Sequence, residues 1–284
     1  MANLIDIRRR IRSVKNTQQI TKAMKMVAAA RLRRAQDRIL ATRPYAEEIR
    51  RVMANLAAHA GDLHHPLLES RPEKKVLLVV VTGDKGLAGS FNANVLRRAG
   101  EVIPRLAAVE LLLLGRKGVD FFRRRPLKVR KGHTTLFSNV TYAQAQEIAE
   151  DLSTAYAAGE YDSVRVVYNR FKSIMSQELT EETLLPIPAP AEQDASASRE
   201  YLFEPSAESI LEELLPRYIT FQVYRVLLES QAAEHAARMT ASDSATKNAG
   251  EIIDRLTLRY NRARQAAITT QLIEVVSGAN ALEG

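Results

Sequence analysis

The chain has 284 residues, of which 46% are hydrophobic, so it is long enough to bury a core in one large domain or two small ones. It contains no cysteine, which excludes disulfide bonds, thiolate nucleophiles and cysteine-bound zinc. Its five histidines show no metal-ligand spacing, so we expect no metal and no other cofactor.

Positive charge is concentrated near the N-terminus. Residues 1–51 carry 14 lysines and arginines against four acids, a net charge of +10, whereas the whole chain carries +8. A basic segment of this kind predicts an acidic partner, which is a nucleic acid, an anionic lipid or an acidic protein surface. The N-terminus lacks the apolar run of a secretory signal, and we expect the protein to be cytoplasmic.

Residues 3–59 predict one long helix, because they contain no glycine and are rich in helix-forming side chains. Apolar residues recur there at steps of three or four and form a narrow stripe. The stripe consists of Ile7, Ile11, Val14, Ile20, Met24, Val27, Ile49, Met53 and Leu56. A stripe this narrow indicates a single partner helix rather than a globular core.

The middle of the chain alternates between strand-like and helix-like segments. Apolar β-branched runs predict strands at 76–82, 110–114 and 163–169, and helical segments are expected at 93–106 and 142–158. The more polar segment 178–188 is a candidate edge strand. This alternation favours a Rossmann-like, open, parallel α/β domain.

Residues 205–281 predict a second long helix, about 20 residues longer than the first. Both long helices meet the middle domain at the same end, so they must run antiparallel as a coiled coil. The expected organisation is an N-terminal helix at 1–60, an α/β domain at 61–204 and a C-terminal helix at 205–284.

The end of the second helix is unusually poor in charge. Between 266 and 282 the one charged residue is Glu274. We expect this apolar tip to be enclosed by another molecule, although it is also compatible with folding back onto its own chain. Its apolar residues include Ile268, Leu272, Val275, Val276 and Leu282.

A glycine-rich segment, Thr82–Ser90, lies between the first predicted strand and the next helix, where phosphate-binding loops are found. Its spacing matches neither the dinucleotide fingerprint nor the P-loop. We interpret it as a tight turn whose glycines adopt positive φ, with a nucleotide site as the alternative.

Four segments together resemble the gamma subunit of F-type ATP synthase. The first runs from Ile7 to Arg31 (IRRRIRSVKNTQQITKAMKMVAAAR), and the others follow in the family's order. They are 83–92 (GDKGLAGSFN), 234–240 (EHAARMT) and 260–269 (YNRARQAAIT), the last leading to 273–278 (IEVVSG). The two ends of the chain carry the specific matches, while the middle matches in general pattern.

This resemblance implies a non-catalytic subunit, present once per complex, that rotates as a central shaft inside a hexamer of alternating alpha and beta subunits. It further implies contacts with an epsilon subunit and with a membrane ring of c subunits, at the cytoplasmic face of a bacterial cell membrane. Proton flow would turn the ring, and the nucleotide chemistry would belong to beta.

The resemblance also assigns contact residues. Lys22, Met24 and Lys25 fall where the family's first helix meets the acidic lever loop of beta, although some relatives carry an acid at position 25. Arg264, Gln265 and Thr269 match the patch that meets the beta catch loop, while 270–273 depart from the common pattern. Tyr201, Phe203 and Glu204 match the foot segment that rests on the c ring.

Two other functions are weighed against this one. A basic coiled coil that binds nucleic acid would explain the charge of residues 1–51, but that segment lacks aromatic side chains on which bases stack, apart from Tyr45. A nucleotide-dependent enzyme would explain the glycine-rich turn.

Overall fold

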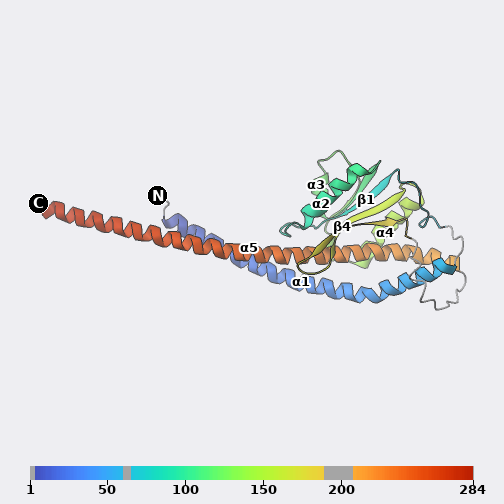
Figure 1. The fold of residues 1–284 in the computed structure, drawn as a ribbon, viewed down its shortest axis with the longest axis horizontal. Helices are drawn as coiled ribbons and strands as arrows, with labels where there is room; N and C mark the ends of the chain where they lie inside the picture. The colour runs from blue at the N-terminus through green and yellow to red at the C-terminus, as the bar shows by residue number, and fades with distance from the viewer. Residues whose placement is uncertain (1–3, 60–64, 189–206, 284) are drawn as a thin grey trace. The chain divides into compact units, whose positions relative to one another are not determined.

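The computed structural model describes residues 4–59, 65–188 and 207–283, without the side chains of 50, 54–59, 207–208 and 281–283 (Figure 1). The chain divides into two compact units, Met1–Val27 with Met239–Gly284, and Ala28–Arg238. We call them the helical unit and the α/β unit. The two long helices, α1 (Leu4–His59) and α5 (Ala207–Glu283), each contribute to both. The predicted boundaries at 60 and 204 instead follow the elements along the chain.

A five-stranded sheet forms the centre of the α/β unit. Its strands are β1 (Val76–Val81), β2 (Val109–Leu114), β3 (Lys128–His133), β4 (Ser163–Phe171) and β5 (Gln177–Leu185), in the order β3-β2-β1-β4-β5. The first four are parallel, and β5 pairs antiparallel with β4. The predicted parallel α/β architecture is therefore confirmed, and its candidate edge strand is antiparallel to the rest.

Helices cover both faces of the sheet, which explains why its central strands are continuous apolar runs. On one face, Leu78 and Val80 pack against α2 (Phe91–Val102) and α3 (Arg116–Phe122). On the other face, Leu77 and Val79 pack against α4 (Tyr142–Ala157) and α5 (Figure 1). Two 3-10 turns, Ile103–Arg105 and Leu136–Ser138, complete the unit.

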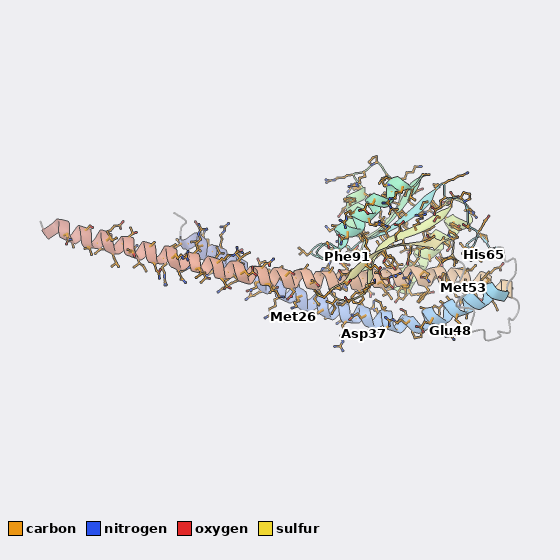
Figure 2. All side chains as sticks on the ribbon, in the orientation of Figure 1. Met26, Asp37, Glu48, Met53, His65 and Phe91 are labelled. Atoms are coloured by element: carbon orange, nitrogen blue, oxygen red, sulfur yellow. The ribbon has the colours of Figure 1, made fainter. Side chains whose placement is uncertain are left out.

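The long helices join this second core. Met53 of α1 is 5% exposed and belongs to the same cluster as Leu215 and Leu227 of α5 (Figure 2). Phe91, at the start of α2, packs with Ala233 and other small residues of α5. Within the α/β unit, α5 is thus built into the core.

Two elements were absent from the sequence prediction. The short helix α3 has seven residues, too few to show a helical period. Strand β3 has the sequence KVRKGH and is mostly exposed at the edge of the sheet, so it lacks the apolar alternation of a half-buried strand. Basic side chains on an edge strand discourage pairing with other chains.

In the helical unit, α1 and α5 run antiparallel, as predicted. Polar contacts join them at successive positions: Arg8 donates to the Tyr260 hydroxyl at 2.5 Å, and the Gln18 amide donates to the Thr246 carbonyl at 3.4 Å. Lys25 forms an ion pair with Asp243 at 2.6 Å. The partner's number falls as the residue number rises, which is the signature of an antiparallel pair.

Part of the predicted apolar stripe was wrong. Ile7 is buried at 4% exposed, but Ile20 and Val27 are 59% and 52% exposed. Steps of three and four from Ile7 lead through Ile11 and Val14 to polar residues. Gln18 and Lys25 occupy the next partner-facing positions. The helix keeps one facing side, and the sequence fills the middle of that side with polar groups.

Candidate functional site

The C-terminal end of α5 has no covering from the described part of the chain. Every described side chain from Ile268 to Asn280 is exposed, and Leu272 and Val275 are 60% and 69% exposed. The alternative in which the tip folds back onto its own chain is therefore wrong. Val276 shares this exposure at 58%, whereas the side chain of Leu282 lies outside those described.

The residues expected at the lever loop differ in their surroundings. The Lys22 side chain is exposed, and Met24 is half-buried. The Lys25 ammonium is held by Asp243 of the same chain, and this pairing lowers the pKa of the Asp243 carboxyl. Of the two lysines, Lys22 is therefore the one whose side chain is exposed and makes no ion pair within the described residues.

The residues expected at the catch loop all lie on the exposed surface of α5. Arg264 and Gln265 are exposed, and so is Thr269, whose hydroxyl donates to the Gln265 carbonyl at 3.0 Å within the helix. That internal bond leaves the lone pairs of the Thr269 hydroxyl available to a donor from outside.

These two groups form separate bands along the helical unit. Lys25 lies opposite Asp243, while Arg8 lies opposite Tyr260, so Arg264 is beyond the part of α5 that faces Lys25. At 1.5 Å per residue the two bands are roughly 30 Å apart along α5. The structure therefore does not bring the two predicted groups together.

The expected foot residues Tyr201, Phe203 and Glu204 lie outside the described residues.

A further cluster, which the sequence reasoning did not single out, surrounds the turn after β1. The Asp84 carboxylate accepts the backbone N–H groups of Arg116, Thr135 and Phe137 at 3.0–3.1 Å. The Asn92 side chain accepts from the Gly83 N–H at 2.8 Å. Asp84 thus ties the turn to the segments that follow β2 and β3.

The prediction that the glycines of this turn adopt positive φ is confirmed for Gly89 alone. Only Gly89 has positive φ, at 55°, while a non-glycine residue, Leu87, adopts a φ of 58°. Gly83 is needed for space, because a Cβ there would lie 2.9 Å from the Glu234 carboxyl carbon. Gly83 and Glu234 each belong to one of the segments that resemble the family. Their presence in those segments was the only sequence feature that could have suggested their contact.

Glu234 itself is buried on α5, at 4% exposed, where it pairs with Arg238 at 2.5 Å. Burial raises the pKa of its carboxyl, and Arg238 opposes this shift. The neighbouring His235 has its pKa lowered to about 4, first by burial and then by Arg238 and Arg31. The imidazole is therefore neutral at physiological pH.

Neither region provides an arrangement typical of catalysis. Within the described ranges, no three acidic or histidine side chains gather in a way that suits a metal ion. Nor does any helix there combine the length and apolar character needed to cross a bilayer. What the helical unit offers is exposed helix surface and an exposed apolar end.

Comparisons with known proteins agree with the resemblance. The family model described as ATP synthase matches residues 3–282. The ATP synthase gamma chain of Geobacter sp. (strain M21) is 51% identical over the full length of both chains, and that of Pelotomaculum thermopropionicum is 50% identical, again over both full lengths. The chain belongs to the ATP synthase gamma chain family. The expectation of a non-catalytic subunit agrees with this membership, since the gamma chain is not the subunit that carries the catalytic sites.

Solved structures give the same family a fold. A chain from the central stalk and c-ring structure of the Tetrahymena thermophila mitochondrial ATP synthase is 31% identical, with a TM-score of 0.61 over 80% of this chain and 99% of that one. A chain from the Euglena gracilis mitochondrial enzyme is 20% identical, with a TM-score of 0.71 over 98% and 94%, and it supports the fold alone. The two long helices and the α/β sheet are thus a fold that this chain shares with chains of mitochondrial ATP synthases.

Proposed function

We propose that this chain is the rotating central shaft of a bacterial F-type ATP synthase, and that it couples rotation of the c ring to the catalytic sites of beta. The observation that carries the proposal is the bare end of α5, where all described side chains from Ile268 to Asn280 are exposed although a single charge is present. Apolar helix of this kind needs an enclosing partner. In a gamma chain, the hexamer of alpha and beta subunits is the partner that fits.

The two bands of contact residues are the proposed contact surfaces of this shaft for beta. Lys22 with Met24 would meet an acidic lever loop, while Arg264, Gln265 and Thr269 would meet a catch loop farther along α5. Exposed cations and amides suit contacts that form at one angle and break at another, because each gains a charge-assisted or neutral hydrogen bond only when its partner is aligned.

The remaining partners are proposed on family membership. One copy of the chain would associate with epsilon and with the c ring, the latter through the segment containing Tyr201, Phe203 and Glu204. The chain would then lie at the cytoplasmic face of the cell membrane, attached through the ring. The 31% identical chain comes from a structure of the central stalk and c ring, which supports this arrangement.

A rotation assay tests the proposal. Because the chain has no cysteine, a single Ala107→Cys substitution on the exposed surface of the α/β unit permits specific attachment of a bead or a gold rod. The labelled chain is assembled with its own alpha and beta subunits, which are immobilised, and ATP is added. We expect the probe to rotate in one direction. An ATP-hydrolysing complex in which the probe stays still, or a failure to assemble at all, contradicts the proposal.

The band assignments have their own test. A photo-crosslinking amino acid at position 22 should label beta, and one at position 265 should label a different loop of beta, as identified by mass spectrometry. Position 25 serves as the matched comparison, because it faces Asp243 of the same chain, so a crosslinker there should label α5 more than beta. If positions 22 and 265 label the same beta peptide equally, the two bands do not contact separate loops of beta.

A further inference from the structure

A cavity of about 210 Å³ lies at the carboxyl edge of the sheet, entirely within the α/β unit. Its walls come from α1, from the turn after β1, from the start of α3, from the segment after β3 and from α5. The charged residues on these walls are Arg31, Asp84, Lys85, Arg116, Glu234 and Arg238. The proposed rotary function makes no use of this cavity.

The acids on the walls are already occupied. Asp84 accepts three backbone N–H groups, which satisfy its two oxygens. Glu234 is paired with Arg238 at 2.5 Å, and a second bond from the Arg238 guanidinium goes to the Gly86 carbonyl at 3.3 Å. Hydrogen bonding satisfies the Asp84 oxygens without removing their charge, so the walls carry four cations against two acids, a net charge of +2.

The remaining cations have no such partner. Within the described ranges, the side chains of Arg31, Lys85 and Arg116 make no hydrogen bond and no ion pair, although the charge of Arg31 lowers the pKa of the Glu234 carboxyl. They come from α1, the turn after β1 and the start of α3, three segments that folding brings to one place. With cations in excess of acids on the walls, a bound anion would reduce the repulsion among the three cations.

His235 is the second indication of a ligand. It lies in the wall at 6% exposed, and its Nδ1 atom has no hydrogen-bond partner in the described part of the chain. A buried polar atom without a partner is uncommon in proteins and often marks an absent ion or water. The ring also lines a neighbouring cavity. The charged residues on the walls of the two cavities are Arg31, Arg34 and Arg38 from α1, Glu234 and Arg238 from α5, and Asp84, Lys85 and Arg116 from the sheet edge.

The position and size of the cavity narrow the class of ligand. In open α/β sheets, ligands bind outside the carboxyl ends of the strands, where the turns after β1 and β2 lie here. Pockets for organic ligands are usually about 300–1,000 Å³, so this cavity suits a small ion better than a whole nucleotide. The guanidinium group of arginine and the ammonium group of lysine commonly bind phosphoryl oxygens in proteins.

We propose that this cavity is a binding site for a small phosphate-class oxyanion, held by Arg31, Lys85 and Arg116. The anion would join α1 to the carboxyl edge of the sheet, because its ligands come from both. The glycine-rich turn then has a binding role in which Lys85 contributes the charge, although it is not a nucleotide loop of either known spacing.

Calorimetry with the full-length chain tests the site. Inorganic phosphate is titrated at constant ionic strength, with chloride as the balancing anion, and pyrophosphate and ADP are titrated in parallel. We expect saturable one-to-one binding of phosphate or pyrophosphate. If ADP binds no more weakly than pyrophosphate, the cavity is a nucleotide site and the size argument is wrong. If neither phosphate nor pyrophosphate shows saturable binding up to about 10 mM, the proposal is wrong.

Charge-matched variants locate the anion. Lys85→Ala and Arg116→Gln should each weaken binding at least tenfold, since each removes a charge-assisted hydrogen bond. Lys117→Gln and Arg33→Gln remove the same charge from neighbouring positions that do not line the cavity, and they should change binding less than twofold. Equal weakening in all four variants would mean diffuse screening and would contradict a built site. Circular dichroism on each variant confirms that it is folded.

A histidine readout separates this cavity from any other anion site. In full-length chain labelled with ¹³C-histidine, the resonance that His235→Gln removes is titrated with and without phosphate. We expect the pKa of His235 to rise from about 4 when the anion is bound, because a nearby negative charge favours the imidazolium. Binding heat with an unchanged His235 titration would place the anion elsewhere.

Discussion

Replacing Arg225 with methionine should destabilise the α/β unit. Arg225 lies on α5 and is the centre of an ionic cluster between that helix and the last two strands. Its guanidinium donates to Glu182 of β5 at 2.5 Å and to the Tyr168 hydroxyl of β4 at 3.1 Å, and it lies 3.5 Å from Glu229. Methionine keeps most of the apolar stem and removes the charge.

The size of the effect follows from burial. The Arg225, Glu182 and Glu229 side chains are 25%, 22% and 17% exposed, so they lie between surface pairs, worth about 0–1 kcal/mol, and buried pairs, whose disruption costs about 3–5 kcal/mol. The substitution takes one cation from two carboxylates, but Arg170 remains 3.2 Å from Glu182 and 3.5 Å from Glu229. We therefore expect a loss of about 2 kcal/mol, or roughly thirtyfold in the unfolding equilibrium.

Urea unfolding of the full-length chain, followed by circular dichroism, measures this loss. Arg217→Met is the matched control, because Arg217 lies on the same helix in an ion pair with Glu213 whose side chains are 60% and 70% exposed. The control should change the free energy of unfolding by less than about 0.5 kcal/mol. If Arg225→Met costs no more than Arg217→Met, the cluster contributes no more than a surface pair and the reasoning fails.

Four further outcomes follow. Gly115→Ala should prevent normal folding, since a Cβ there would lie 1.9 Å from the Thr82 carbonyl oxygen at a φ of +102°, and expression with a protease-resistance assay checks this. Leu227→Ala, at a fully buried position, should cost about 2–5 kcal/mol in the same urea assay. Because the pKa of His235 is lowered to about 4, the unfolded chain binds a proton between pH 6.5 and 4 that the folded chain does not bind. The free energy of unfolding should therefore fall by up to about 3 kcal/mol as the pH drops through that window. His235→Gln should remove this part of the pH dependence of stability. Finally, Lys85→Ala should leave ATP turnover by the reconstituted complex nearly unchanged, and a loss of more than about tenfold without disassembly would favour an enzymatic role for the turn.

The strands that could be predicted from the sequence are those buried on both faces. β1 is the run VLLVVV, and all six of its side chains are buried, so composition alone marks it as a central strand. β3 carries Lys128, Arg130 and Lys131, and nothing in this local pattern distinguishes an exposed edge strand from a basic loop. Its existence depends on pairing with β2, a contact that only the folded chain provides.

The helical stripe shows a different limit. One face of α1 contains Ile7, and another contains Ile20 and Val27. In the middle of the helix the apolar residues favoured the second face, but the structure leaves that face exposed. The partner supplies the missing information: Asp243 and Thr246 of α5 require polar residues opposite them. Since the partner is more than 200 residues away in the sequence, a local period could not reveal this.

The candidate contact sites were reachable from sequence only through the family resemblance. The exposed tip could be predicted from composition, because 17 consecutive residues with one charge are conspicuous in a charged chain. The cavity beside His235 could not, since Arg31, Lys85 and Arg116 are scattered in sequence and converge only when α1 packs beside the sheet edge. Their spacing carries no motif.

The polar contacts between α1 and α5 in the helical unit restrict one kind of motion more than others. Arg8–Tyr260, Gln18–Thr246 and Lys25–Asp243 fix the axial alignment of the two helices at three depths. Sliding one helix by a single turn, about 5.4 Å, would break all three contacts together. Bending both helices as a pair leaves each contact intact, so shear along the pair should meet far more resistance than flexing does.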